Sequence, residues 1–151
     1  MSNTVSFEEE LEEKGTILHT NKGVSMMPLL RQNKDVMIIS RVEGRLKKYD
    51  APLYKRPNGD YVVHRVLRVD KDSYVICGDN CFRREYGIKE EQIKGVLTGI
   101  IRNGKTISVN DKRYKLYVHL WCDFFYIRAF LLFALAKFKG LLRKLGFKKN
   151  K

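Results

Sequence analysis

Between residues 16 and 109 the sequence alternates short apolar segments with turn signals, and this pattern restricts the chain to a small β-rich fold. The apolar segments are rich in β-branched residues, as strands are. Two of the intervening turns are Asn58-Gly59 and Asn103-Gly104, and Asn-Gly is a strong hairpin signal. The expected strands cover residues 16–18, 35–42, 51–54, 61–69, 74–77, 95–101 and 106–109. We therefore expect a compact, mainly β domain with few helices.

Helical patterns stand at the two ends of the chain. Residues 6–14 read as a short helix, with Ser6 as N-cap and Glu9 completing a capping box. Beyond Tyr114, apolar residues recur in alternating steps of three and four, which places them on one helical face. These residues are Phe124, Ile127, Leu131, Ala134, Phe138, Leu141 and Leu145. The spacing predicts a C-terminal helix over about residues 120–145, apolar at its start and basic toward its end.

The net charge of +13 is concentrated in the C-terminal third of the chain. Residues 102–151 hold 13 basic and 2 acidic side chains, a net of +11, which leaves +2 for residues 1–101. The lysines alternate with apolar residues, so we expect an anionic membrane surface as partner and no nucleic acid. The apolar run 129–136 is too short to span a bilayer. We expect membrane association from the cytoplasmic face, because basic segments tend to remain there.

Composition excludes several classes of protein. A hydrophobic content of 44% argues against disorder, and three cysteines are too few for a disulfide scaffold. Cys77 and Cys81 do not recur as a second ligand pair, so we expect no metal site and no cofactor. The acidic start of the chain does not read as a secretory signal. We divide the chain into a polar helical segment (1–15), a catalytic domain (16–112) and a membrane-associating helix (113–151).

A serine and a histidine stand where an activated nucleophile would need them. Ser25 lies on a bend bounded by Gly23 and Pro28, where its hydroxyl can be exposed. A serine hydroxyl needs a nearby base, and His64 in the valine-rich segment 61–67 is the best candidate. The residues alone leave two other interpretations open, a loop serine without chemistry and a half-buried strand histidine.

These residues resemble the type I signal peptidases, in the branch that uses histidine as base. The family's box G-x-S-M-x-P matches residues 23–28 at every fixed position, His64 is followed by Arg and Val as in the family, and residues 78–80 read G-D-N. The resemblance spans about residues 16–101. It implies a coiled β-sheet peptidase domain with Ser25 as nucleophile and His64 as general base. Lys22 departs from the family, many members of which have a serine there that contributes to the oxyanion hole.

The resemblance also implies an acid that orients the histidine, and two residues are candidates. In the family this acid follows the Asp of G-D-N by six residues, which points to Glu85, where the family more often has Asp. We favour Glu85 as the orienting residue and expect Asp79 to structure the site. A turn-capping Asp79 and a solvated Glu85 remain the structural alternatives. Asp35 and Asp50, each just before a strand, match acidic turns that are structural in the family.

The function implied is that of a serine endopeptidase that removes a leader or signal segment from a precursor. The precursor would bind as an extended strand along a β edge. A self-cleaving relative of the SOS repressors is a variant of this hypothesis, although no DNA-binding domain stands before Ser25. The alternative from another class is a catalytically inactive adaptor that keeps the peptidase fold and binds a peptide or a membrane surface.

Overall fold

The structure is a computed structural model that describes residues 7–144, with side chains through Gly140. Strand residues outnumber helical ones, which confirms the predicted mainly β class. The helices are α1 (Phe7–Lys14), α2 (Lys112–Asp123) and α3 (Phe125–Lys144), with one 3-10 turn at Glu90–Gln92. The strands are β1 (Thr16–Thr20), β2 (Val36–Ser40), β3 (Pro52–Lys55), β4 (Tyr61–Val63), β5 (Arg65–Val69), β6 (Tyr74–Cys77), β7 (Glu85–Ile88), β8 (Ile93–Arg102) and β9 (Lys105–Ser108).

The larger sheet is antiparallel and curls into a half-barrel. Its strand order is β1-β2-β8-β3-β4, and β9 pairs with the far end of β8. The long strand β8 is the spine of the sheet, since it pairs with β2, β3 and β9. Strands β1 and β4 are the two edges of this order, each with a single partner. The main strand order therefore ends at β1 and β4, and Phe7 of α1 packs against His19 of β1 and Tyr61 of β4.

The smaller sheet has the order β5-β6-β7, and the chain enters it immediately after β4. We predict a single strand over residues 61–69, and this prediction is wrong, because the segment divides at His64. Residues 63–66 are all buried, since they run between the cores of the two sheets. In β5, the strand that follows His64, the backbone amide of Val66 donates a hydrogen bond to the carbonyl oxygen of Asp50. A strand that changes sheets keeps its β-branched composition, so composition alone does not reveal the change.

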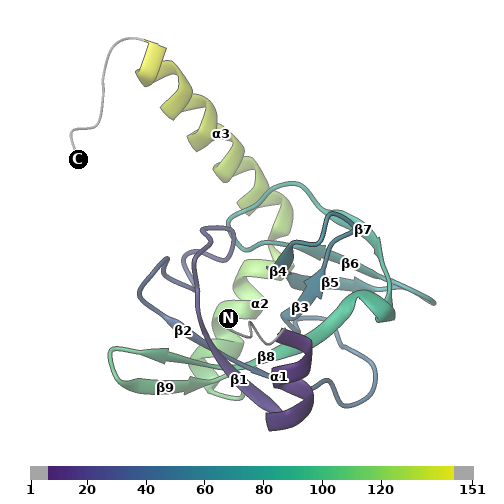
Figure 1. Cartoon of the computed structure of the whole chain (residues 1–151). Coiled ribbons are helices and arrows are strands. Elements are labelled where there is room, and N and C mark those ends of the chain that lie inside the picture. Colours follow the sequence, from purple (N-terminus) through teal and green to yellow (C-terminus); the bar gives the residue numbers. More distant parts are fainter. Residues whose placement is uncertain (1–6, 145–151) are drawn as a thin grey trace.

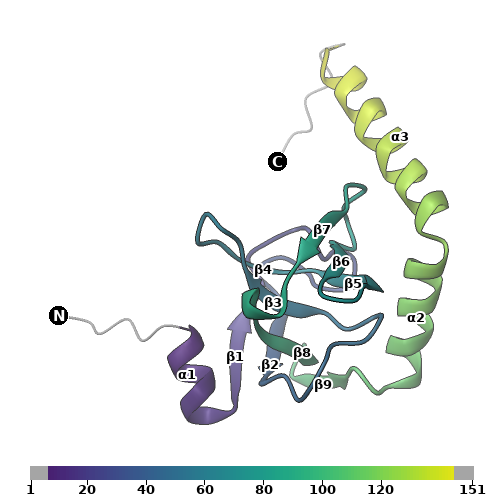
Figure 2. The same ribbon diagram turned by 90° about the vertical axis from the view of Figure 1, so that its right-hand side faces the viewer.

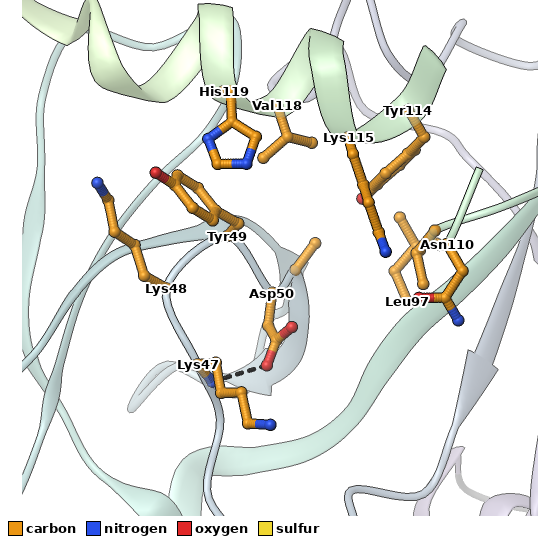
Figure 3. Close-up of a pocket in the computed structure, with 12 residues that line it drawn as sticks. Lys47, Lys48, Tyr49, Asp50, Leu97, Asn110, Tyr114, Lys115, Val118 and His119 are labelled. Carbon is orange, nitrogen blue, oxygen red and sulfur yellow. Dashed lines mark hydrogen bonds between the residues drawn. The ribbon is translucent and has the colours of Figure 1, made fainter. Parts of the chain in front are cut away.

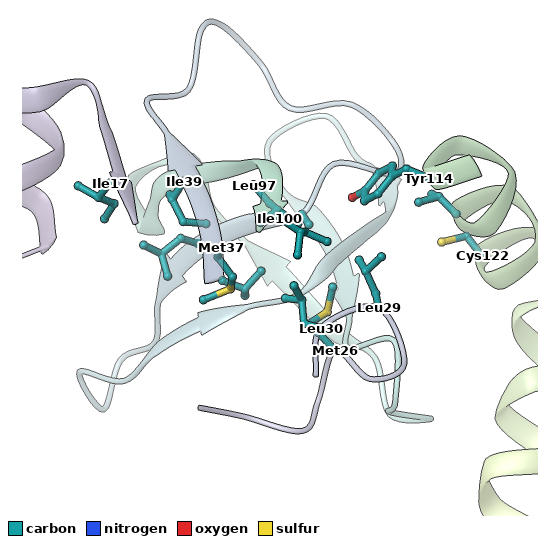
Figure 4. Packing of buried hydrophobic residues seen from close by; sticks show 14 of the residues in the cluster. Ile17, Met26, Leu29, Leu30, Met37, Ile39, Leu97, Ile100, Tyr114 and Cys122 are labelled. Carbon is teal, nitrogen blue, oxygen red and sulfur yellow. The ribbon is translucent and has the colours of Figure 1, made fainter. Parts of the chain in front are cut away.

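The main core lies inside the half-barrel (Figure 4). Side chains of β1, β2 and β8 meet the buried residues of the serine turn, Met26 and Leu30. Helix α2 closes this core through Tyr114, Val118 and Cys122. The first helical residues after position 112 thus pack as part of the β domain.

The predicted C-terminal helix over residues 120–145 is two helices, with a break at Phe124. Helix α2 begins earlier than predicted, at an N-cap made by Asp111, whose side chain accepts from the amide of Arg113 (2.7 Å). Helix α3 then projects away from the β domain (Figures 1 and 2). The two helices are bent by 77°. Two parts of the predicted helices lie outside the described residues. They are the N-cap Ser6 and the end of the basic tail, residues 145–151, which includes the periodic residue Leu145.

Strand β7 is absent from the strands predicted from the sequence. Only Ile88 of its four residues is buried, and Gly87 has a φ of 71°. An edge strand of this kind carries almost no apolar signal, because only one of its neighbours is another strand. The missed strand matters for the site, since it begins with Glu85.

Candidate active site

Ser25 lies on a turn that is fixed by buried side chains on its C-terminal side. Met26 is 2% exposed and Leu30 is fully buried, so both hold the turn to the core. The backbone closes on itself through Met27 N donating to Val24 O (3.1 Å) and Leu30 N donating to Met26 O (2.9 Å). Ser25 itself is half-buried. The turn thus presents the serine at the surface of a rigid segment.

Two buried polar residues hold the ends of this turn. The amide group of Asn21 donates to Gly23 O (2.9 Å) and to Leu30 O (3.2 Å). The fully buried Asp35 accepts from the side chains of Arg31 and Arg102. Burial alone would raise the pKa of Asp35, but these hydrogen bonds outweigh it and hold the pKa well below its usual range. Asp35 is therefore an anchor of the turn, in keeping with its expected structural role.

His64 is buried at the junction of β4 and β5, and one of its ring nitrogens faces Glu85. His64 Nδ1 lies 2.9 Å from Glu85 Oε1 and 3.2 Å from the Tyr54 hydroxyl. A carboxylate only accepts hydrogen bonds, so the contact assigns the proton to Nδ1 when the ring is neutral. The lone pair is then on Nε2, which is buried and has no hydrogen-bond partner among residues 7–144.

Glu85 is fixed by two further donors. The Tyr54 hydroxyl donates to Glu85 Oε1 (2.9 Å), and Arg56 donates from Nη2 to Oε1 (2.6 Å) and from Nε to Oε2 (3.1 Å). Burial would raise the pKa of Glu85, but the hydrogen bonds from Arg56 and Tyr54 outweigh it and lower the pKa. For His64, burial lowers the pKa more than the charge of Glu85 raises it. The pair at neutral pH is a carboxylate beside a neutral imidazole.

The serine turn and the histidine meet at Gly78. A Cβ built on Gly78 would lie 2.6 Å from Ser25 O, 2.8 Å from Cys81 Sγ and 3.0 Å from His64 Nε2. The neighbouring Asn80 donates its backbone amide to Ser25 O (2.7 Å). A real Cβ atom at these distances would clash with its neighbours. The close approach of the serine turn, His64 and the loop 78–81 therefore requires glycine at position 78.

Ser25 and His64 line the same pocket, of about 470 Å³, together with Cys81 and residues of β1 and β4. No hydrogen bond joins the two side chains, because His64 Nε2 has no partner, and within the described part of the chain the Ser25 hydroxyl makes no hydrogen bond. The structure thus brings nucleophile and base candidates into one pocket without joining them. In ligand-free enzymes such contacts are often long and shorten when substrate binds.

Asp79, the other acid candidate, pairs with Arg65 and makes no hydrogen bond with His64. The two side chains are fully buried and make two hydrogen bonds of 2.8 Å each, from Arg65 Nε and Nη2. Tyr117 of α2 also donates to the carboxylate of Asp79 (3.0 Å). None of the hydrogen bonds of Asp79 reaches His64. Of the two acids, Glu85 contacts the histidine and Asp79 supports the loop.

The sequence gives no indication of two members of this site, Tyr54 and Arg56. Tyr54 ends a predicted strand and Arg56 stands in a predicted turn, and both are common surface positions. Their roles follow from the pairing of β3 with β4, which places Tyr54 opposite Val62, two residues before His64. Within residues 7–144, no group of three or more His, Cys, Asp or Glu side chains is arranged to hold a metal ion.

A second pocket, of about 240 Å³, lies between α2 and the loop at residues 47–51 (Figure 3). Lys47, Lys115 and His119 stand around it, and the amide of Lys47 donates to Asp50 (2.7 Å). It shares no lining residue with the pocket of Ser25 and His64. It contains no pairing of a nucleophile with a base, so we place no catalytic role there.

In comparisons with known proteins, no family model, no curated protein and no solved structure matches this chain.

Proposed function

We propose that the protein is a serine endopeptidase with Ser25 as nucleophile, His64 as general base and Glu85 as the residue that orients the base. The observation that carries the proposal is the contact between Glu85 and His64 Nδ1, which leaves Nε2 unpaired beside the Gly78 loop. An unpaired buried nitrogen costs stability. A general base needs a free lone pair to accept a proton, so the proposed role of His64 explains why Nε2 is unpaired.

The reaction follows from this arrangement. His64 Nε2 accepts the proton of the Ser25 hydroxyl as the oxygen attacks the scissile carbonyl carbon. The resulting oxyanion needs hydrogen-bond donors, and the Ser25 amide has no partner within residues 7–144. Nε2 then gives its proton to the leaving amine, and water hydrolyses the acyl-enzyme with His64 again acting as base. Glu85 stays ionised throughout and stabilises the imidazolium.

The substrate in this proposal is a precursor whose leader or signal segment binds as an extended strand. The pocket of Ser25 lies between the two edges of the half-barrel, because it is lined by His19 of β1 and by all three residues of β4. Edge strands offer unpaired backbone groups to an extended peptide. A peptide paired with one of these edges would run along the pocket that contains Ser25, beside Phe7 of α1.

We also propose that α3 attaches the protein to an anionic membrane surface at its cytoplasmic face. Along α3, seven large apolar side chains are at least 46% exposed: Tyr126, Ile127, Phe130, Leu131, Phe133, Leu135 and Phe138. Lys137 and Lys139 stand on the same helix. Among the described residues, no single helix is long and apolar enough to cross a membrane, although the bent pair α2 and α3 meets the criteria of length and composition.

The alternative is a catalytically inactive adaptor that binds a peptide in the same pocket. The observation that favours it is the missing hydrogen bond between Ser25 and His64. Such an adaptor would use the two strand edges and leave the hydroxyl unreactive.

A serine-reactive phosphonate separates the two functions. We expect the wild-type protein to gain one phosphonyl group, located on Ser25 by mass spectrometry, and Ser25→Ala to gain none. Ser73→Ala, a change of the same kind outside the pocket, serves as control and should react like wild type. No labelling of the wild type, or equal labelling of Ser25→Ala, would rule out the activated serine and leave the adaptor.

A further inference from the structure

Arg128 is a buried cation at the base of a largely exposed helix. It stands in the first turn of α3 and is only 6% exposed. Its Nη1 donates to the carbonyl oxygen of Asp79 (2.7 Å) and reaches that of Gly78 (3.4 Å). The guanidinium carbon lies 4.8 Å from the ring centre of Phe125 and 5.8 Å from that of Trp121. The residue therefore points from α3 into the loop that borders the candidate active site.

Helix α2 contacts the same loop residue from its own side. Trp121 Nε1 donates to the carbonyl oxygen of Asp79 (2.7 Å), and the Tyr117 hydroxyl donates to its carboxylate (3.0 Å). The rings of Tyr117 and Trp121 stack on each other, with centres 5.4 Å apart. Both C-terminal helices thus bind Asp79, one residue after Gly78.

The other side of this loop carries the nucleophile. The loop turns sharply, because Cys81 N donates to Gly78 O (3.0 Å), and Asn80 donates its amide to Ser25 O (2.7 Å) and its side chain to Val24 O (3.2 Å). Gly78 is packed against His64 and Ser25. Residues 78–81 therefore form a short, closed link between the C-terminal helices and the backbone of Ser25.

The way in which Arg128 is buried argues for a specific role in this link. Its Nε and Nη2 have no hydrogen-bond partner of good geometry within residues 7–144. The nearby Cys77 thiol interacts with the guanidinium, which partly offsets the rise in the thiol pKa that burial causes. Burying charged donors with such weak partners is costly. An apolar side chain of similar size would attach α3 to the domain without this cost. What an apolar side chain would lack is the pair of contacts to the carbonyl oxygens of Gly78 and Asp79.

We propose that Arg128 is a positioning residue for Ser25. Helix α3 would then support the proposed active site through this side chain, in addition to extending from the domain. Arg128 fixes the loop 78–81, and the loop fixes the Ser25 backbone relative to His64. The effect on catalysis rests on the proposed peptidase function. The effect of Arg128 on the conformation of the loop does not depend on the peptidase function. It can be measured separately through the reactivity of Cys81.

Cys81 is a suitable reporter, because it is half-buried with its sulfur against Gly78, whereas Cys77 and Cys122 are buried. Removal of the Arg128 charge raises the pKa of Cys81, so the rates are compared on the plateau of the pH–rate profile, where the thiol is fully ionised. On that plateau we expect iodoacetamide to alkylate Cys81 about tenfold faster in Arg128→Met, because the loop has lost hydrogen bonds from a charged donor. Labelling of Ser25 by the phosphonate should slow by a similar factor, without a change in the half-saturating concentration. Arg128→Lys keeps a charged donor and should lie between the two.

The matched control is Arg113→Met, the same substitution at an exposed position in the first turn of α2, which should keep both wild-type rates. Wild-type alkylation of Cys81 in the two Arg128 variants would overturn the proposal, as would slower Ser25 labelling without faster Cys81 alkylation. Loss of the folded state in both variants, seen by circular dichroism, would also overturn it, because Arg128 would then hold the whole domain. A wild-type protein that ignores the phosphonate refutes the peptidase function, while the Cys81 rates still decide the positioning.

Discussion

At the scale of single residues, the imidazole of His64 is subject to opposing influences. Burial lowers its pKa below the ordinary value of 6.5, Glu85 raises it, and Arg56 lowers it. A general base must be neutral, so activity should rise with pH through this pKa and reach its plateau above it. The proposed enzyme should therefore remain active somewhat below pH 6.5.

Glu85→Gln tests this account. Without the carboxylate, the pKa of His64 falls further, so the acidic limb of the pH–rate profile should move to lower pH. The plateau rate should fall by about tenfold or more, because the proton of Nδ1 and the ring orientation are no longer fixed. The rate of phosphonate labelling between pH 4 and pH 8, about the range in which histidine titrates, measures both effects. Glu43→Gln, an exposed change of the same kind, should match wild type, and an unchanged profile in Glu85→Gln would exclude Glu85 as the orienting residue.

Gly78→Ala is a second test at this scale. The new methyl group would lie 2.6 Å from a backbone oxygen of the serine turn and 3.0 Å from His64 Nε2, and neither can yield without moving the site. We expect phosphonate labelling to be largely lost and unfolding stability to fall by about 1–3 kcal/mol, the usual cost of overpacking. Gly140→Ala, where nothing lies within 4 Å, should leave phosphonate labelling unchanged and should not lower unfolding stability, because alanine is the better helix former. Wild-type labelling of Gly78→Ala would contradict the convergence of three segments at this glycine.

At the scale of secondary-structure elements, the sequence predicts most strands because their β-branched runs and turn residues are local signals. It does not predict that the run at residues 61–69 divides between two sheets, since that division depends on pairing with β3 and β6. The same limit applies to the site. The G-x-S-M-x-P box locates Ser25 locally, whereas the contact of Glu85 with His64 depends on strand β7, which carries almost no apolar pattern.

The buried pair of Arg65 and Asp79 joins β5, the loop after β6 and helix α2. Asp79→Asn would leave a buried guanidinium without its counter-charge, and breaking such a pair typically costs about 3–5 kcal/mol. We expect urea unfolding to show a loss of this order. The exposed Asp123, which pairs with Lys48, is the control, and Asp123→Asn should have a much smaller effect. Equal midpoints for the two variants would show that the pair is not a main support of the loop.

At the scale of the whole molecule, the domain and α3 present different surfaces. The half-barrel has a near-neutral sequence, and α3 extends away from it (Figure 2). Helix α3 carries exposed aromatic side chains and lysines. A helix of this kind gains free energy at an interface from apolar burial and from attraction to anionic lipid. Because Arg128 joins the base of α3 to the Gly78 loop, attachment through α3 would also fix the orientation of the candidate active site relative to the membrane.

Liposome flotation tests this attachment. Truncation before α2 would remove three core residues, so point variants are the better probes. We expect the full chain to float with anionic vesicles, less at high salt, and the double variant Phe130→Asp, Phe138→Asp to stay unbound. Lys137→Glu should weaken binding about fivefold or more, since each basic residue near the surface contributes on the order of 1 kcal/mol. Tyr86→Asp, an exposed aromatic residue on β7, is the control and should bind like wild type. Equal flotation of the wild type and the double variant, or none for either, would exclude α3 as the membrane-binding element.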